Sequence, residues 1–314
     1  MAQRKIVGIG ETVLDIVFRA GQPQAAVPGG STFNAMISLG RTAGRIFPGL
    51  PIIMISQIGD DPVADLVTSF MEKNGVRTDG MKRIAGTQST VSMALLDESN
   101  NASYEFFRDS STPSFKAGEI TFNPGDIVLF GSFFAINPDT REETQRLVKA
   151  AKDAGAIIYY DINFRKSHLK DLETVRPYIE KNCALSDIVR GSSEDIGYLY
   201  GSSDASSVYK EHISRLCSTF ICTRGGDTTQ VFSPKARCEF EVPEIKTVST
   251  IGAGDNFNAG MVYGLLKGNY SKTSAGALGE DDWKALVPVA SRFSANVCES
   301  IYNYVDPSFA DTLA

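Results

Sequence analysis

The chain has 314 residues, of which 42% are hydrophobic and 22% are charged, and its formal net charge is -6. A chain of this length buries enough surface to form a core without disulfides or metals, and its composition excludes disordered and collagen-like proteins. The acidic balance disfavours nucleic acid as a partner, and the longest apolar stretch, Ile127 to Ile136, is about half of the roughly 20 residues that a membrane helix needs. We therefore expect no membrane partner and a cytoplasmic location, where the five cysteines, which include no Cys-x-x-Cys pair, stay reduced.

Short apolar runs alternate along the chain with segments of helical spacing, which is typical of βαβ units. The runs that we interpret as buried strands are 4–9, 51–58, 126–131, 156–161, 187–190 and 219–223. Helices are predicted after Gly30, between Asp61 and Gly75, and over about 139–154, 171–183, 204–217, 255–267 and 282–299, and 271–279 is predicted as a polar loop. The alternation indicates an α/β fold with a mostly parallel central sheet.

Two pairs of short strands break this rhythm because no helix separates their members. The first pair, 13–18 and 24–27, is joined by a turn at 20–23, and the second pair, 89–96 and 102–107, by a turn at 99–101. We expect these strands to form a small separate sheet, a lid within 13–28 and 89–108. Its alternating apolar residues, Met93 among them, predict a homodimer in which two lids pack together.

Several familiar motifs are missing from the sequence. There is no Gly-Lys dipeptide for a Walker A loop, and neither His-Arg-Asp nor Asp-Phe-Gly of the protein kinases occurs. Gly8-Ile9-Gly10 lacks the third glycine of a dinucleotide fingerprint, so a dinucleotide-dependent oxidoreductase is a distant alternative. His168 and His212 lack the context of a Ser-His-Asp or metal site, and we expect both at the surface.

The segment Gly252-Ala253-Gly254-Asp255 indicates an anion site. Its glycines permit a tight turn, and the apolar spacing that follows predicts a helix, so unpaired amides and the positive end of the helix dipole meet at the turn. Asp255 lies in the first turn, where it can accept a proton from a hydroxyl that attacks a bound phosphate. Arg165 follows a predicted central strand, at the edge where open α/β sheets bind ligands, and its guanidinium can hold phosphate or sugar oxygens.

Residues upstream suit a ligand that is rich in hydroxyl groups. Gly29 and Gly30 open a helix with bare backbone, and Asn34 follows about one turn later. Asp15 begins the first lid strand, and its carboxylate can accept two hydroxyl protons. These features predict a sugar-binding site.

Taken together and in this order, the segments resemble the ribokinase-like (PfkB) family of carbohydrate kinases, from Gly8 to about Glu299. The matching motifs are Gly29-Gly30 with Asn34, Ile58-Gly59-Asp60-Asp61, Asp161-x-Asn163-x-Arg165 and Gly252-Ala253-Gly254-Asp255. Within the family, the chain is most similar to the fructokinases, through Pro-Gly-Gly-x-x-x-Asn and the segment 104–109. The resemblance implies a single ribokinase-like domain over 1–314, a three-layer α/β/α sandwich with a β lid. It also implies transfer of the γ-phosphate of ATP, with Mg²⁺, to a free sugar, fructose above others.

The resemblance also implies roles for individual residues. Asp255 would be the catalytic base, the backbone of Gly252, Ala253 and Gly254 the anion hole, and Arg165 a stabiliser of phosphoryl charge. The residues that would hold the sugar are Asp15, Gly29, Gly30, Asn34, Arg108 and Asn163. Thr223, Gly225 and Asn296 would border the nucleotide, and Glu194 would act on magnesium through water.

The chain departs from the family pattern at both metal sites. The usual Asn-x-x-Glu appears as Gly191-Ser192-Ser193-Glu194, so only the glutamate is present. Ser249 stands where relatives carry an aspartate near a monovalent-cation site, which predicts weak activation by potassium. The alternatives are a 2-keto-3-deoxygluconate kinase, with Arg108 as the cation for a carboxylated sugar, a nucleoside kinase, and a sugar-binding regulator that has lost phosphoryl transfer.

Overall fold

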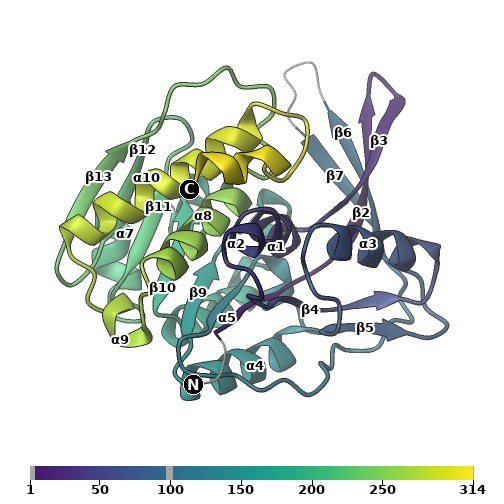
Figure 1. Ribbon diagram of the computed structural model, residues 1–314, viewed down its shortest axis with the longest axis horizontal. Helices are drawn as coiled ribbons and strands as arrows, with labels where there is room; N and C mark the ends of the chain where they lie inside the picture. The colour runs from purple at the N-terminus through teal and green to yellow at the C-terminus, as the bar shows by residue number, and fades with distance from the viewer. Residues whose placement is uncertain (1–3, 97–101, 314) are drawn as a thin grey trace.

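The computed structural model describes residues 4–96 and 102–313. A nine-stranded sheet in the order β13-β12-β11-β10-β9-β8-β1-β4-β5 forms its centre (Figure 1). The strands are β1 Ile6–Ile9, β4 Ile52–Gly59, β5 Met81–Ile84, β8 Ile127–Gly131, β9 Ile157–Asp161, β10 Ile188–Ser192, β11 Phe220–Thr223, β12 Thr228–Phe232 and β13 Arg237–Glu241. Neighbours from β11 to β5 run parallel, whereas β12 and β13 are antiparallel to the strands beside them.

Helices cover both faces of this sheet because successive residues of a strand point to opposite sides. Ile6 and Leu129 pack into one apolar cluster with α1, α3, α8 and α10, and Val7 and Phe130 pack into a second with α4, α5 and α6. The helices are α1 Ser31–Arg41, α2 Ala43–Ile46, α3 Pro62–Lys73, α4 Arg141–Asp153, α5 Leu172–Leu185, α6 Ser193–Tyr200, α7 Ala205–Val208, α8 Ala253–Lys267, α9 Lys272–Ala275 and α10 Glu280–Cys298. The two clusters, one on each face, confirm the three-layer sandwich.

The helix predicted between Asp61 and Gly75 shows how local sequence sets the element boundaries. Asp61 caps α3 by accepting a hydrogen bond from the amide of Ala64 at 2.9 Å, and Pro62 occupies the first turn, where its missing N–H costs nothing. Gly75 follows the helix with a φ of +76°, a conformation that favours glycine.

A separate four-stranded sheet in the order β3-β2-β6-β7 projects beside the main sheet (Figure 1). Its strands are β2 Val13–Arg19, β3 Gln22–Gly29, β6 Val91–Leu96 and β7 Ala102–Phe107, as the sequence predicts, while the predicted turn at 99–101 lies outside the described residues. In the β2–β6 register Asp15 lies opposite Ser92 and Ile16 opposite Met93. The two faces therefore differ, one carrying Asp15 and the other an apolar row.

Some elements differ from the sequence-based expectation. The short strands β5, β12 and β13 and the helix α6 were not predicted. The helix expected over 204–217 is only α7 followed by a wider π-helical turn at Tyr209–Ile213, and the expected loop 271–279 contains α9. None of the helices within 4–96 and 102–313 is long and apolar enough to cross a membrane.

The cysteines and histidines lie close to where the sequence places them. All five cysteines are free thiols, and all except the half-buried Cys238 are buried. His168 and His212, expected at the surface, are half-buried because each ring stacks on an aromatic neighbour. The ring centroids of His168 and Phe133 are 4.0 Å apart, and those of His212 and Tyr200 are 4.3 Å apart.

Candidate active site

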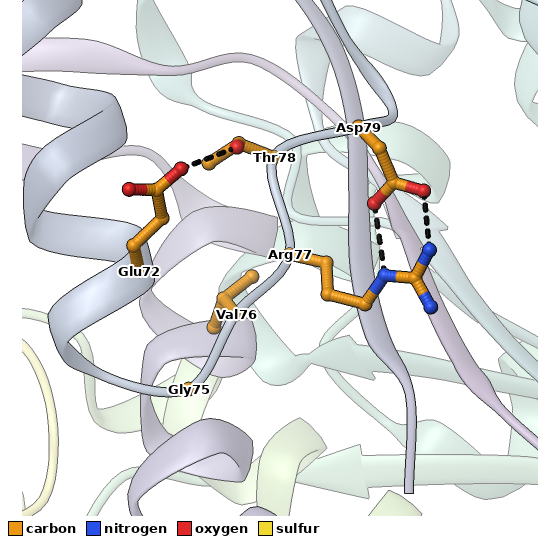
Figure 2. Close-up of a pocket in the computed structure, with 6 residues that line it drawn as sticks. All are labelled: Glu72, Gly75, Val76, Arg77, Thr78 and Asp79. Carbon is orange, nitrogen blue, oxygen red and sulfur yellow. Dashed lines mark hydrogen bonds and ion pairs between the residues drawn. The ribbon is translucent and has the colours of Figure 1, made fainter. Parts of the chain in front are cut away.

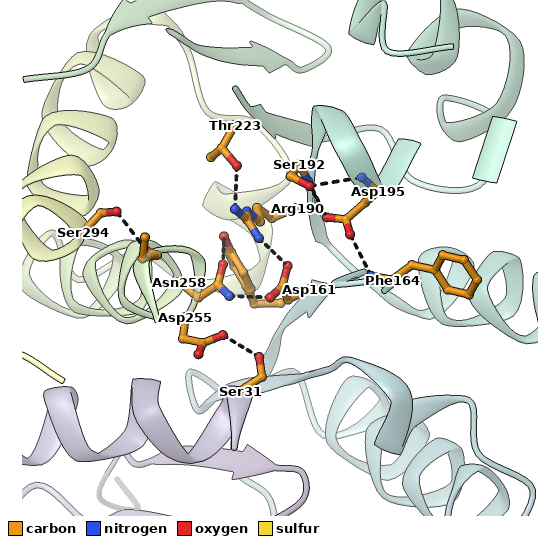
Figure 3. Close-up of polar contacts among 12 residues, drawn as sticks. Ser31, Asp161, Phe164, Arg190, Ser192, Asp195, Thr223, Asp255, Asn258 and Ser294 are labelled. Atoms are coloured by element: carbon orange, nitrogen blue, oxygen red, sulfur yellow. Dashed lines mark hydrogen bonds and ion pairs between the residues drawn. The ribbon is translucent and has the colours of Figure 1, made fainter. Parts of the chain in front are cut away.

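The Gly252 turn is built around the start of α8, at the carboxyl ends of the central strands. Gly252 is the N-cap residue with a φ of +78°, and a Cβ there would lie 2.9 Å from the carbonyl oxygen of Asn303. The side-chain amide of Asn256 donates to the carbonyl oxygens of Gly252 and Asn303, each at 2.8 Å. Ser294 of α10 donates to the carbonyl of Ala253 at 2.9 Å (Figure 3). The backbone of the turn is thus fixed from three sides, with its amides at the helix N-terminus.

Asp255 is buried in the first turn of α8 and is held by two residues of α1. Ser31 Oγ donates to Asp255 Oδ1 at 2.7 Å, and Asn34 Nδ2 donates to Asp255 Oδ2 at 2.8 Å (Figure 3 shows Ser31). Burial raises the pKa of Asp255 above its ordinary value, while the bonds from Asn34 and Ser31 and the charge of Arg165 oppose this. The structure therefore joins the predicted base to the helix that carries the predicted sugar residues.

Asn34, on α1, and Thr12, just before β2, have buried polar atoms without partners among the described residues. Asn34 Oδ1 and Thr12 Oγ1 are both buried and make no hydrogen bond within the part of the chain that the structure describes. A buried acceptor without a partner costs free energy. The arrangement fits a ligand whose hydroxyl groups donate to these oxygens.

Asp15 lies against the bare backbone of Gly29. A Cβ on Gly29 would lie 2.2 Å from Asp15 Oδ2, and the hydroxyl of Ser92 donates to Asp15 Oδ1. Burial raises the pKa of Asp15 to about 6, and the carboxylates of Glu11 and Asp255 add to the rise while the Ser92 bond opposes it. Position 29 therefore has no room for a side chain while the Asp15 carboxylate stays where it is.

Asp15→Asn should become more stable relative to the wild type as the pH rises, because only the wild type carries this titrating group. The folded-state pKa of about 6 exceeds the ordinary value of 3.8, so the native protein binds this proton more tightly than the unfolded chain does. Wild-type stability should therefore decrease between about pH 4 and 6 by up to roughly 3 kcal/mol through this group, and the variant lacks that decrease. Urea unfolding of both proteins from pH 4.5 to 7.5 measures the difference; a pH-independent difference would contradict the assignment.

Gly30 needs the conformation that only glycine adopts readily. Its φ is +122°, and an added Cβ would lie 2.3 Å from the carbonyl oxygen of Glu11. Gly30→Ala should lower the free energy of unfolding by about 2 kcal/mol or more and raise the KM for the acceptor, because the β1–β2 loop must move.

A matched control separates the clash at Gly30 from backbone strain. Gly21, in the β2–β3 turn, has a φ of +72°, but its added Cβ would meet none of the described atoms within 4 Å. Gly21→Ala should cost only the strain, about 1 kcal/mol, and leave the KM for the acceptor unchanged. Thermal unfolding and steady-state kinetics of the two variants make the comparison. Equal effects would mean that Gly30 has no role at the site.

Arg190 was not predicted from the sequence, and it lies at the centre of the polar network. It is buried at the sheet edge, where Nη1 donates to Asp161 Oδ1 at 3.0 Å and Nη2 donates to Thr223 Oγ1 at 2.5 Å (Figure 3). Asn258 Nδ2 donates to the other oxygen of Asp161 at 2.8 Å. The predicted nucleotide residue Thr223 is thus connected to α8 through Arg190 and Asp161.

Arg165, Asn163 and Arg108 lie around this centre. Arg165 is exposed just before the turn Lys166–Asp171, close enough for its charge to lower the pKa of Asp255. Asn163 has a φ of +38° in the same segment. Arg108, directly after β7, donates three hydrogen bonds of 2.8 to 3.2 Å to the carboxylate of Glu11. Arg108 is therefore already paired with an acid.

The remaining predicted residues, Gly225, Asn296 and Glu194, make no hydrogen bond to the Arg190 and Asp161 network within the described part of the chain. Gly225 lies in an exposed turn between β11 and β12 with a φ of +58°, and Asn296 on α10 accepts from the amide of Asp306 at 2.9 Å. Glu194 is exposed on α6, whereas its neighbour Asp195 is buried and accepts from the amide of Phe164 at 2.7 Å. Asp195, not Glu194, is the acid of this segment that faces the Asp161 and Arg190 pair.

Two surface hollows among the described residues lie away from this network. One of about 450 Å³ is lined by residues 72 and 75–79, where Glu72 accepts from Thr78 and Arg77 pairs with Asp79 (Figure 2). A second of about 360 Å³ lies along 117–122 and one face of α4. Neither contains a predicted site residue, and the polar side chains of the first already bond to each other. The polar network around the α8 turn is therefore the candidate site.

A large, mostly parallel sheet sandwiched by helices, with a small separate sheet beside its carboxyl edge, is the ribokinase-like α/β fold. The chain belongs to the pfkB family of carbohydrate kinases, whose family model matches residues 3–301. It is therefore a sugar kinase of that family, an ATP-dependent phosphotransferase, and the resemblance seen in the sequence is confirmed.

Named relatives are similar over nearly the whole chain. A fructokinase of Vibrio alginolyticus is 23% identical over 296 residues, covering 93% of this chain and 90% of the relative. Among solved structures, the fructokinase of Vibrio cholerae O395 in its fructose-, ADP- and calcium-bound form has a TM-score of 0.79 at 18% identity, with 95% and 94% of the two chains covered. Aminoimidazole riboside kinase of Salmonella enterica, complexed with aminoimidazole riboside and an ATP analog, has a TM-score of 0.78 at 21% identity, with 99% and 98% covered.

Proposed function

We propose that this protein phosphorylates free fructose with ATP and magnesium. The observation that carries the proposal is the buried Asp255, which lies beside the amides at the start of α8 and contacts Ser31 and Asn34 of the helix that opens with Gly30. A hydroxyl acceptor that takes the place of Ser31 would meet the base and the phosphate site together.

The charges around the acceptor site favour a neutral, hydroxyl-rich substrate. Glu11, Asp15 and Asp255 bring three carboxylates together, and the nearby Arg108 is paired with Glu11. A sugar acid would have to compete with Glu11 for that guanidinium and would face the other two carboxylates. This argues against a 2-keto-3-deoxygluconate kinase, whereas a riboside remains compatible with the same groups.

The proposed reaction transfers the γ-phosphoryl group to the sugar hydroxyl. The hydroxyl proton passes to Asp255, an O–P bond forms to the sugar, and the bond to the β-phosphate oxygen breaks as ADP leaves. The raised pKa of Asp255 makes it a stronger base than an ordinary aspartate. Amides 252–255 and Arg165 would stabilise the charge on the transferred group.

Magnesium would enter with the nucleotide and neutralise phosphate charge. The described residues hold no cluster of three or more side chains that would ligate a metal on their own, which fits an ion held mainly by phosphates and water. Glu194, exposed at the start of α6, would act on it through water. Ser249 Oγ accepts from the amide of Ile251 at 3.2 Å, and its neutral hydroxyl supports the proposal of weak potassium activation.

A panel of acceptors tests the proposed function. ADP formation from ATP should be measured with fructose, ribose, 2-keto-3-deoxygluconate and aminoimidazole riboside. We expect fructose to give the highest kcat/KM and the keto acid to give a value at least about tenfold lower. A higher kcat/KM for another acceptor would overturn the assignment of fructose. Fructose binding without any sugar-dependent ADP formation would indicate a sugar-binding regulator.

We propose that the small sheet is a lid through which two chains form a homodimer. Asp15 and Ser92 are on one face of the sheet, and by the β2–β6 and β6–β7 registers Ile16, Met93 and Leu95 are on the other. Leu95 is 39% exposed, and Phe107, in register with Val91 of that row, is 50% exposed. This apolar face is what supports a second lid as the partner.

Replacing Met93 with aspartate should convert the dimer into monomers. A charge in the apolar row would lose its water on association, so the variant should sediment at half the mass. Its KM for the sugar should rise, and sugar-independent ATP hydrolysis should increase because the site closes less well. Glu105 is exposed and lies opposite Met93 on the same face, so Glu105→Gln, which removes a charge there, is the control of opposite sign and should not weaken the dimer. A wild-type protein that is monomeric and fully active at micromolar concentration would contradict the proposal.

A further inference from the structure

Arg190 is a buried cation that connects the ends of three neighbouring strands. Its side chain is 7% exposed, and it reaches from β10 to Asp161 at the end of β9 and to Thr223 at the end of β11. A buried guanidinium is costly unless it is paired and hydrogen-bonded. Its position at the edge that carries the site therefore calls for an explanation beyond packing.

The guanidinium lies directly against Gly254. A Cβ added to Gly254 would lie 2.9 Å from Nη1, 3.0 Å from Nη2 and 3.3 Å from Cζ of Arg190. Gly254 precedes Asp255, and its backbone belongs to the turn that we assign to the phosphate. The bare glycine thus lets a positive charge approach the turn from behind.

Arg190 also fixes the orientation of α8 through Asp161. One oxygen of Asp161 accepts from Arg190, and the other accepts from Asn258 Nδ2, one turn into the helix. Tyr159 donates its hydroxyl to the Oδ1 atom of Asn258 at 3.1 Å, which fixes that amide. The network Arg190, Asp161, Asn258 therefore ties the first turn of α8 to the strand ends.

The charge balance requires this cation. Asp161, Asp195 and Asp255 are all buried here, and both Asp161 and Asp195 stabilise the charged form of Arg190. Without Arg190, these acids would oppose an incoming triphosphate. Arg190 Nε is buried and makes no hydrogen bond within residues 4–96 and 102–313, so the guanidinium still has a donor to give.

We propose that Arg190 is a positioning residue for the terminal phosphate of the nucleotide. It holds Gly254 and α8 in place and supplies the buried positive charge behind the turn amides. The inference rests on the proposed phosphate site at 252–255 and does not depend on which sugar is the acceptor.

Nucleotide binding without any sugar tests this role. Calorimetry should compare the Kd values of AMP, ADP and the non-hydrolysable ATP analogue AMP-PNP, all with magnesium. Arg190→Met should weaken AMP-PNP binding by about tenfold or more, weaken ADP less, and change AMP by under about twofold, because the lost charge acts on the terminal phosphate. Arg190→Lys keeps the charge and should recover part of the AMP-PNP affinity.

Two further variants guard against a folding defect. Arg190→Met leaves Asp161 buried without its cation, so the double variant Arg190→Met/Asp161→Asn removes the pair together and should fold more readily. It should show the same selective loss of AMP-PNP affinity. Thr223→Val removes one bond but keeps the charge, and should weaken AMP-PNP less than Arg190→Met does.

The outcomes separate this inference from the proposed function. If Arg190→Met and Arg190→Met/Asp161→Asn both bind AMP-PNP in preference to AMP as strongly as the wild type does, the role of Arg190 is wrong. The phosphate site at 252–255 would still stand. Equal losses for AMP and AMP-PNP would indicate a merely structural residue and would overturn it too. A wild-type protein that binds AMP-PNP no better than AMP would overturn both Arg190 and the phosphate site at 252–255.

Discussion

Replacing Asp255 with asparagine should lower kcat by about two powers of ten or more, the usual scale for losing a positioned base. The amide keeps the size of the side chain but cannot take the hydroxyl proton. Because Asp255 accepts from Ser31 and Asn34 on its two oxygens, the variant loses one of these bonds and should still fold. Single-turnover measurement of the phosphorylated product separates this loss of chemistry from slow product release.

The control for Asp255→Asn is the same change at a surface carboxylate. Asp204 caps α7 and is exposed, and its carboxylate accepts hydrogen bonds from Ser206 and Ser207. Asp204→Asn should therefore retain wild-type kcat. If Asp255→Asn also turns over at the wild-type rate, Asp255 is not the base and the proposed mechanism is wrong.

The pH profile should carry the signature of a buried base. Asp255 must be ionised to accept a proton, and burial raises its pKa above that of an ordinary aspartate. Activity should consequently decrease on the acid side at a higher pH than an exposed carboxylate would give.

The strands of the sheet core could be predicted because they are buried on both faces. Runs such as Ile52–Gly59 and Ile127–Gly131 are almost uninterrupted hydrophobic segments, which parallel strands require. In contrast, β13 alternates exposed and half-buried residues over only Arg237–Glu241. It is a strand because it pairs antiparallel with β12. A short, half-exposed strand has too weak a local pattern to be distinguished from a loop.

The part of the site that lies in one segment, Gly252 to Asp255, could be predicted from the sequence. The contacts between residues that are far apart in the chain could not. Arg190 is simply the last residue of the strand predicted over 187–190. Its partner Asp161 lies 29 positions away and becomes its partner only after β9 and β10 pair. The contact between Asn34 and Asp255 spans 221 positions.

The acid of α6 shows the limit of spacing alone. Counting from Gly191 selects Glu194, but the helix begins at Ser193, with Ser192 and Asp195 forming a capping box. This places Asp195 inward and Glu194 outward, a difference of one residue in helical phase. Sequence spacing identifies the segment, whereas the start of the helix decides which of its carboxylates is buried.

Replacing Asp15 with alanine should raise the KM for the sugar more than about tenfold while changing the KM for ATP by under about threefold. Asp15 is buried between Gly29 and Ser92, on the lid face that we propose for the acceptor, and among the described residues its carboxylate makes no hydrogen bond to the α8 turn or to Thr223. Its carboxylate can accept two hydroxyl protons, so the alanine variant leaves sugar hydroxyls without partners.

Ser92→Ala is the control for Asp15→Ala, because it removes the bond to Asp15 but leaves the carboxylate facing the site. It should raise the KM for the sugar much less than Asp15→Ala does. Steady-state kinetics with each substrate varied in turn, together with thermal unfolding, make the comparison. Equal increases in both KM values after Asp15→Ala would mean that the change disturbs the whole fold or that Asp15 does not contact the sugar. Asp15 lies close enough to Asp255 for that carboxylate to raise its pKa, so a selective effect would support an acceptor that lies between the two acids.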